Sequence, residues 1–92
     1  MVTAIVLIRA QHGRAKAIAE ALADFPEISE VYSVGGSYDV IAIVRVSKNE
    51  DIATMVTERM THVAGIERTE TLIAFKSFSR HDLERVFSLG LD

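Results

Sequence analysis

Five consecutive small and polar residues interrupt two β-rich runs, and their types could hold a ligand. They are Gly35, Gly36, Ser37, Tyr38 and Asp39. Glycine accepts a positive φ at no steric cost, so the glycine pair predicts a hairpin turn between two strands. A carboxylate beside flexible backbone N–H donors can hold a small polar molecule. We therefore expect a ligand-binding loop at the opening of the second strand.

Asp39 is the residue of this loop best suited to contact a ligand. Its carboxylate can accept charge-assisted hydrogen bonds from an ammonium group. The alternative is an Asx-type turn, in which the carboxylate bonds local backbone N–H groups. Gly35 and Gly36 serve the turn in either case, and their N–H groups can also approach a ligand carboxylate as a small anion nest. Tyr38 either covers the ligand or packs as an edge aromatic.

Two threonines, Thr69 and Thr71, are the second group of candidates. Residues two apart on a strand share one face, so two hydroxyl groups can point at one ligand. Threonine is also an ordinary strand residue, and this alternative stays open. The charged neighbours Glu67, Arg68 and Glu70 are interpreted as strand-edge charges.

Composition excludes several classes of function. The 92 residues allow one domain, and the absence of cysteine excludes disulfides and thiolate chemistry. The net charge of −3 disfavours direct binding to nucleic acid, because the electrostatic term has the wrong sign. His12, His62 and His81 are not spaced as metal ligands. The sequence also lacks a phosphate-binding or dinucleotide glycine pattern, so we expect neither a metal nor a cofactor.

No targeting or membrane-spanning segment is recognisable in the sequence. The apolar run Ala4–Ile8 ends at Arg9 and is not preceded by a basic region. No apolar segment approaches the roughly 20 residues that span a bilayer. We therefore expect a cytoplasmic protein without a membrane partner.

The elements that position these residues follow from hydrophobic periodicity. Four strands are predicted, at Val2–Ala10, Ile28–Val34, Val40–Val46 and Arg68–Phe78. Helices are predicted at Arg14–Asp24, from a Ser47/Glu50 capping box to about Thr61, and at Arg80–Ser88. The order β-α-β-β-α-β predicts an α+β, ferredoxin-like fold with a four-stranded antiparallel sheet, two helices on one face and a short C-terminal helix.

The two central strands predict a partner for the other face of the sheet. Ala4–Ile8 and Val40–Val44 are apolar at every position, whereas two helices cover only one face. The remaining apolar patch exceeds what monomers usually expose, which favours a homodimer packed sheet on sheet. The alternative is that the loop and the C-terminal helix fold over this face.

The motifs resemble a known family. Gly36 to Asp39 followed by Val44 matches a G-x-Y-D-x-x-x-x-V pattern, and Gly65-Ile66 precedes a T-x-T strand at Thr69 and Thr71. Together with the element order, this resembles the effector-binding RAM domain of the Lrp/AsnC (feast/famine) transcription regulators, from Val2 to about Phe78. Because the first predicted strand starts at Val2, we expect no helix-turn-helix domain, and the chain resembles stand-alone RAM proteins with a single domain, 1–92.

The resemblance implies a sheet-face dimer, rings of dimers such as octamers or decamers, and an amino-acid effector bound between dimers. The matching site residues are Gly35, Gly36, Ser37, Tyr38, Asp39, Thr69 and Thr71. It implies a non-catalytic module of transcription regulation, and makes a full-length regulator a candidate partner.

Two other functions stay open on the residues alone. One is a small cofactor-free enzyme of the dimeric α+β barrel type, such as a monooxygenase, which needs a polar or histidine-bearing cavity. The other is a protein of assembly or interaction only. The apolar sheet faces offer few acid or base groups, so we expect no enzyme.

Overall fold

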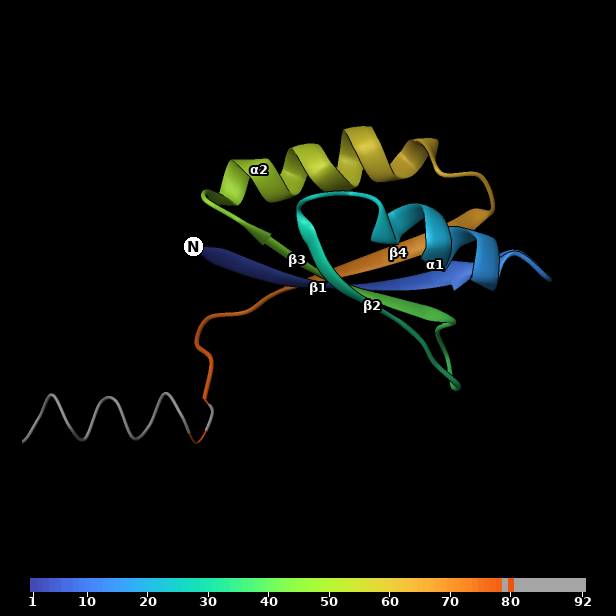
Figure 1. Ribbon diagram of the computed structural model, residues 1–92, viewed down its shortest axis with the longest axis horizontal. Helices are drawn as coiled ribbons and strands as arrows, with labels where there is room; N and C mark the ends of the chain where they lie inside the picture. The colour runs from blue at the N-terminus through green and yellow to red at the C-terminus, as the bar shows by residue number, and fades with distance from the viewer. Residues whose placement is uncertain (79, 81–92) are drawn as a thin grey trace, which may run out of the picture.

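A computed structural model describes residues 1–78 and 80. Its strands are β1 (Val2–Ala10), β2 (Ile28–Ser33), β3 (Val40–Val46) and β4 (Ile66–Ile73). Its helices are α1 (Ala15–Ala23) and α2 (Asn49–Thr54), the latter continued by a π-helical turn (Met55–Arg59) and a 3₁₀ turn (Met60–His62). The strands form an antiparallel sheet in the order β2-β3-β1-β4, with both helices on one face (Figure 1). The predicted ferredoxin-like α+β fold is confirmed.

The core lies between the helices and the sheet. Alternate residues of the two central strands point into it, and six of them are fully buried: Ala4, Val6, Ile8, Val40, Ala42 and Val44. Ile18 and Leu22 of α1 pack against them, as the helical spacing predicts. Truncating a buried isoleucine such as Ile8 to alanine costs about 2–5 kcal/mol, because the cavity adds to the lost burial.

The second helical segment is as long as predicted but begins differently. Its N-cap is Lys48, in extended geometry and without a side-chain capping bond, so the Ser47/Glu50 capping box is wrong. A box needs its glutamate three residues after the cap, and from Lys48 that position is occupied by Asp51. Glu50 instead lies 3.9 Å from the Lys48 ammonium group.

The last strand ends earlier than the sequence predicts. The Ala74 N–H still donates to the Thr3 carbonyl at 2.9 Å, but the paired register of β1 with β4 reaches only Ala4 opposite Ile73, and the chain leaves the sheet before it pairs with Val2. The predicted continuation to Phe78 is therefore wrong. Phe75 is fully exposed as a result. The predicted helix Arg80–Ser88 falls outside the described residues except for Arg80.

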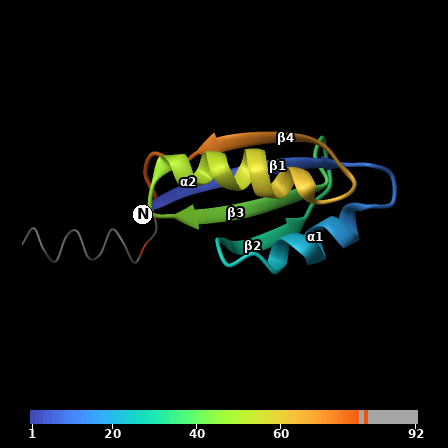
Figure 2. The ribbon, with the colours of Figure 1, turned by 90° about the horizontal axis from the view of Figure 1, so that it is seen from above.

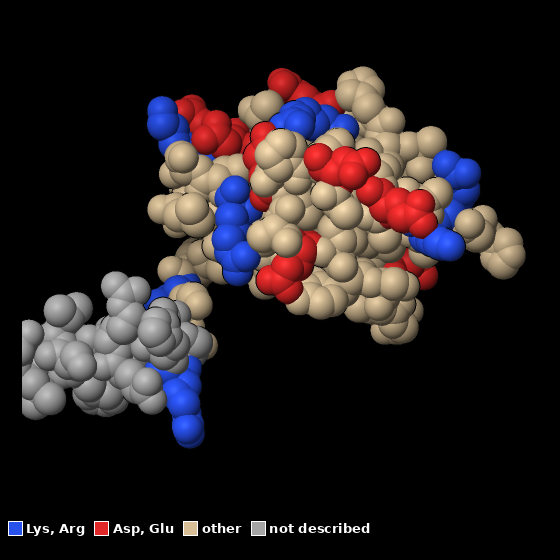
Figure 3. Space-filling view, in the orientation of Figure 1, with Lys and Arg blue, Asp and Glu red and all other residues tan. Residues whose placement is uncertain are grey.

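The other face of the sheet, here called the open face, carries the remaining side chains of the central strands. Figure 2 looks down on the helices, which lie on the viewer's side of the sheet, and within residues 1–78 no helix covers the opposite face. Ile5 stands opposite Ile43 of β3 and Leu72 of β4, and Leu72 and Tyr32 are 45% and 48% exposed. In the view of Figure 3, acidic and basic side chains are interspersed over the surface. Among residues 1–78, the open face is therefore where apolar side chains of β1, β3 and β4 lie without a covering helix.

Candidate functional site

Asp39 fastens the predicted loop to the end of β1. Its N–H donates to the Ile8 carbonyl at 2.9 Å, and its carboxylate Oδ2 accepts the Ala10 N–H at 2.8 Å. Its carbonyl accepts the Val34 N–H at 3.0 Å, which closes the loop on itself. The carboxylate bond spans 29 residues, unlike the local bond of an Asx turn. The described bond engages only one of the two carboxylate oxygens, so Asp39 has an anchoring role that leaves its other oxygen outside this bond.

Other residues of the loop also form hydrogen bonds with β1 and β4. The Tyr38 hydroxyl donates to Glu70 Oε2 on β4, so its side chain crosses the end of β1, the strand between. This hydrogen bond raises the pKa of Tyr38 above its ordinary value, since ionisation would remove the donated proton. The Ser37 carbonyl accepts a bond from Arg9 Nη2 at 2.8 Å. Of the glycine pair, Gly36 adopts a positive φ of 122° and gives the loop its turn.

Thr69 and Thr71 share a face, as predicted, but it is the helix-covered face. They stand opposite Ile8 and Val6, whose side chains are buried in the core. Glu70, the residue between them, stands opposite Leu7 and points to the open face, where it meets Tyr38. Within one chain, the structure therefore brings the loop residues together and the two threonines together. It places Tyr38 and the threonines on opposite faces of the sheet.

The larger grooves of the described residues lie away from the loop 35–39. One of about 570 Å³ crosses the open face between Tyr32 and Phe75. Another, of about 540 Å³, runs between α2 and β4 and is lined by Thr71, Ile73 and Phe75. The loop 35–39 lines neither of these two grooves, and Thr71 is the predicted site residue that lines one of them.

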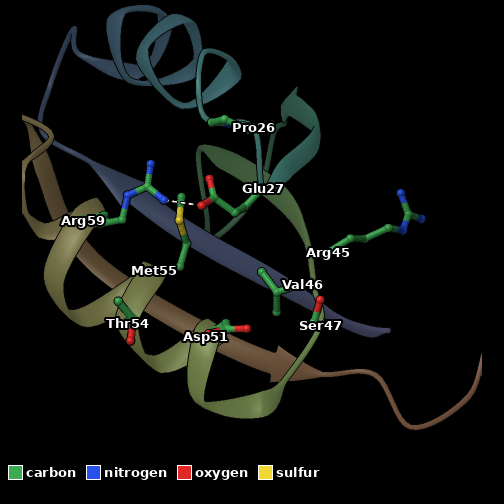
Figure 4. A pocket seen from close by; sticks show the side chains of 9 residues that line it. All are labelled: Pro26, Glu27, Arg45, Val46, Ser47, Asp51, Thr54, Met55 and Arg59. Atoms are coloured by element: carbon green, nitrogen blue, oxygen red, sulfur yellow. Dashed lines mark hydrogen bonds and ion pairs between the residues drawn. The ribbon is translucent and has the colours of Figure 1, made fainter.

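A third groove, of about 490 Å³, lies between the start of β2 and α2 (Figure 4). Glu27 and Arg59 form an ion pair across it, and the Arg59 guanidinium lies 4.9 Å from the centre of the Phe25 ring. The pKa of Glu27 is lowered, mainly because its carboxylate accepts a hydrogen bond from its own backbone N–H and also one from Arg59. Partial burial of Glu27 opposes this shift. This groove holds a structural clamp between two elements.

Arg9, Arg68 and Glu70 are the residues of this region that sequence reasoning did not select. Arg68 and Glu70 look like ordinary strand-edge charges in the sequence. The sequence signal that they share is their position: Arg9 lies two residues from Leu7 on β1, and Arg68 lies two residues from Glu70 on β4. Side chains two residues apart point to the same face, and this is the face opposite to the buried core. Only the β1–β4 register shows that Arg9 and Arg68 stand directly opposite each other.

The described part of the chain lacks the side-chain cluster that a metal site needs. No three His, Asp or Glu side chains of that part are placed to hold a metal ion. His12 and His62 are both exposed, the first in the turn after β1 and the second at the end of the α2 segment. No helix among these residues is long and apolar enough to cross a membrane.

Comparisons with known proteins agree on one family. The model of the Lrp/AsnC ligand binding domain matches residues 3–83. The HTH-type transcriptional regulator FL11 of Pyrococcus horikoshii is 31% identical over 74 residues, which are 80% of this chain and 48% of that protein. The chain thus spans about half the length of the curated relatives it matches.

Solved structures give the same result. TTHA0845 from Thermus thermophilus is 46% identical with a TM-score of 0.81, covering 87% of this chain and all of that one. At 12% identity and a TM-score of 0.77, the regulator NMB0573 of Neisseria meningitidis, solved with L-Met, shares the fold over 86% of this chain and 53% of its own. The family match and the relatives confirm the resemblance seen in the motifs: the chain belongs to the Lrp/AsnC ligand-binding domain family.

Proposed function

We propose that this chain is a non-catalytic module that binds a small effector, an amino acid or a related metabolite, and couples binding to its own assembly. The observation that carries the proposal is the anchored loop 35–39 within a chain of the ligand-binding family. Asp39 and Tyr38 hold the loop against β1 and β4, so its polar groups are ordered before a ligand arrives. Such preorganisation lowers the entropy cost of binding.

The amino-acid class rests on the chemistry of the loop. A zwitterion needs acceptors for its ammonium group and donors for its carboxylate, and the loop offers a carboxylate oxygen of Asp39 beside backbone N–H groups. The hydroxyl groups of Thr69 and Thr71 add donors and acceptors. The L-Met complex of NMB0573 is an example of an amino acid bound by a protein of the same fold.

Assembly enters the proposal through the two faces of the sheet. Tyr38 and the threonines of one chain point to opposite faces, so a ligand that touches both is most simply shared between two copies. The uncovered apolar side chains of the open face support a homodimer packed sheet on sheet. Dimers joined through shared ligands would then form rings, octamers or decamers.

The proposal also sets the place and the partners of the chain. It acts in the cytoplasm, without direct contact to nucleic acid, and a full-length regulator of the same family is a candidate partner. This agrees with relatives that are named as transcriptional regulators. Assembly without a ligand is the second candidate function, and the uncovered open face favours it.

A thermal-shift screen tests the proposal. The intact chain is melted with each common L-amino acid at millimolar concentration, and light scattering follows its assembly. A ligand at about 100 times its Kd adds about 2.7 kcal/mol, a readable shift for a domain of this size. Selective stabilisation that Thr71→Val and Asp39→Asn weaken is expected. A flat panel, with assembly unchanged in both variants, would leave assembly alone as the function.

A further inference from the structure

Two arginines face each other at the end of the open face. Arg9 of β1 and Arg68 of β4 are direct partners in the antiparallel register, and both are exposed. Like charges directly opposite each other destabilise a strand pair. Among the described residues, no carboxylate oxygen lies within 4.0 Å of either guanidinium group. The pair therefore repels, and an anion placed between the two groups would relieve that repulsion.

The arginine pair lies beside the anchored loop. Arg9 Nη2 already holds the Ser37 carbonyl at 2.8 Å. The positive charges of Arg68 and Arg9 both act on the Tyr38 hydroxyl, lowering its pKa against the larger rise that Glu70 causes. Four side chains from β1, β4 and the loop thus meet at one corner of the open face.

The charges of this corner favour a particular anion. Among Arg9, Arg68, Tyr38 and Glu70, two guanidinium groups and one carboxylate give a net charge of +1, which matches one carboxylate better than a phosphate dianion. The Asp39 carboxylate, bound to the Ala10 N–H beside Arg9, disfavours a dianion further. Directly opposite strand residues have Cα atoms roughly 4.5–5.5 Å apart, so two flexible arginine side chains can converge on one group. Guanidinium is planar and donates two parallel hydrogen bonds to a carboxylate.

We propose that Arg9 and Arg68 form the carboxylate-binding subsite of the effector site, at the corner that they share with Tyr38 and Glu70. This inference rests on the proposed function and adds to it the chemical group that the chain recognises. The effector carries a free carboxylate, and replacing that group by an amide removes most of the affinity. Asp39, bound to Ala10 through Oδ2, is left to the ammonium side of the ligand.

Arg45 provides a matched control. It is also a strand arginine on the open face, but at the opposite end of the sheet, where it stands opposite Thr3 of β1. There it donates to Ser29 Oγ at 2.7 Å and lies 4.0 Å from Glu30. Arg45→Gln removes the same charge from the same face without touching the arginine pair.

The experiment compares Arg9→Gln, Arg68→Gln and Arg45→Gln in the intact chain. Each is titrated with the amino acids that stabilise the parent and with their carboxamides, and is melted in sodium acetate and in sodium chloride at equal ionic strength. We expect Arg9→Gln and Arg68→Gln each to weaken amino-acid binding about ten-fold or more, which corresponds to about 1.4 kcal/mol. Both lose the preference for acid over amide and the stabilisation by acetate. Arg45→Gln keeps all three.

Arg68→Gln removes one of two facing positive charges and no described hydrogen bond, so its melting temperature without ligand is expected to be unchanged or higher. Arg9→Gln also loses the bond to the Ser37 carbonyl, so a loss of binding in Arg9→Gln alone would overturn the subsite and assign Arg9 to loop anchoring. Equal binding by parent and both variants would overturn the subsite and leave effector binding intact. An equal loss in Arg45→Gln would reduce the effect to general charge attraction and also overturn it. A change in assembly with unchanged affinity would assign the pair to a second copy instead.

Acetate separates the two levels of the proposal. If no amino acid binds but acetate stabilises the parent and not the arginine variants, the carboxylate subsite holds and the amino-acid effector fails. If amino acids bind and acetate has no specific effect in any variant, the effector stands and the subsite fails.

Discussion

The carboxylate of Asp39 and the backbone N–H of Ala10 are joined by a hydrogen bond of 2.8 Å. The pairing of β1 with β4 shifts register between Arg9 and Ala10, which interrupts the regular ladder at this point. The side chain of Asp39 thus satisfies a donor at the interruption. The bond explains how a loop with two glycines keeps a fixed position over β1.

Asp39→Ala is expected to destabilise the chain by about 1–2 kcal/mol, because it leaves the partly buried Ala10 N–H without its acceptor. Asp39→Asn keeps an acceptor oxygen and is expected to recover most of this loss. Urea unfolding measures both, with Ser37→Ala as the control in the same loop. An Asp39→Ala variant as stable as the parent would contradict the anchoring role.

The chain has two tyrosines, and both are expected to ionise above the ordinary value near 10. The hydrogen bond to Glu30 raises the pKa of Tyr32, and that to Glu70 raises the pKa of Tyr38, because each carboxylate disfavours a phenolate. Ultraviolet absorbance of the phenolate follows the titration. Glu70→Gln is expected to return one of the two transitions, and only one, toward the ordinary value.

The same shift sets a direction for stability at alkaline pH. The folded-state pKa of Tyr38 lies above the unfolded one, so its contribution is fully present below about pH 10 and is lost as pH rises through the folded value. Unfolding measured between neutral and alkaline pH is expected to show a shallower decline for Tyr38→Phe than for the parent. An identical decline would show that the Glu70 bond does not persist in solution.

Glu27 and Arg59 are expected to matter at acid pH. The folded-state pKa of Glu27 lies below its ordinary value of 4.5, so the contribution is present above that value and is lost as pH falls through the folded one. Since the Glu27 and Arg59 side chains are 32% and 41% exposed, Glu27→Gln is expected to cost less than about 1 kcal/mol at neutral pH.

Acid unfolding monitored by circular dichroism tests this, and Glu20→Gln is the comparison. Glu20 lies 4.0 Å from Lys16 in a pair whose side chains are 68% and 91% exposed. Its removal is expected to leave the acid transition where it is. If both variants behave alike, the clamp contributes no more than an ordinary surface pair.

Leu72 and Ile73 offer a test of the dimer face that needs no ligand. They are neighbours on β4 with nearly equal exposure, 45% and 43%, but they point to opposite faces. If the open face forms the dimer, Leu72→Asp is expected to dissociate it, since a buried unpaired carboxylate is costly. Ile73→Asp is expected to leave it intact. Light scattering over a concentration series reads the mass, and dissociation by Ile73→Asp alone would place the interface on the helix side.

The sequence sufficed for the fold because its signals are local. The spacing of Ile18 and Leu22 predicts a buried helix face, and the alternation of Thr69 and Thr71 predicts a shared strand face. The end of β4 at Ile73 is beyond local prediction because the residues up to Phe78 remain compatible with a strand, and only the pairing with β1 shows where the strand ends. The N-cap is Lys48 rather than the predicted Ser47, because Ser47 and Glu50 match a capping pattern that lies one residue before the cap in the structure.

The candidate site shows the same limit more sharply. Tyr38 and Glu70 are 32 residues apart, and nothing in their local sequence indicates a bond between them. The facing of Arg9 and Arg68 depends on a register between strands that are remote in the chain. Long-range register decides which polar groups meet, whereas periodicity only decides which face they share.

The alternation along β4 has a consequence for how such a protein can change over evolution. Thr69 and Thr71 lie on the helix-covered face of the sheet. Arg68, Glu70 and Leu72 lie on the open face, so residues adjacent in sequence belong to two separate faces. Point substitutions can retune one surface while the other is inherited unchanged. A single-residue insertion in the strand would instead exchange the two sets at once. Divergence here is expected to proceed by replacement, and a chimaera that transplants only alternate positions would carry over one property without the other.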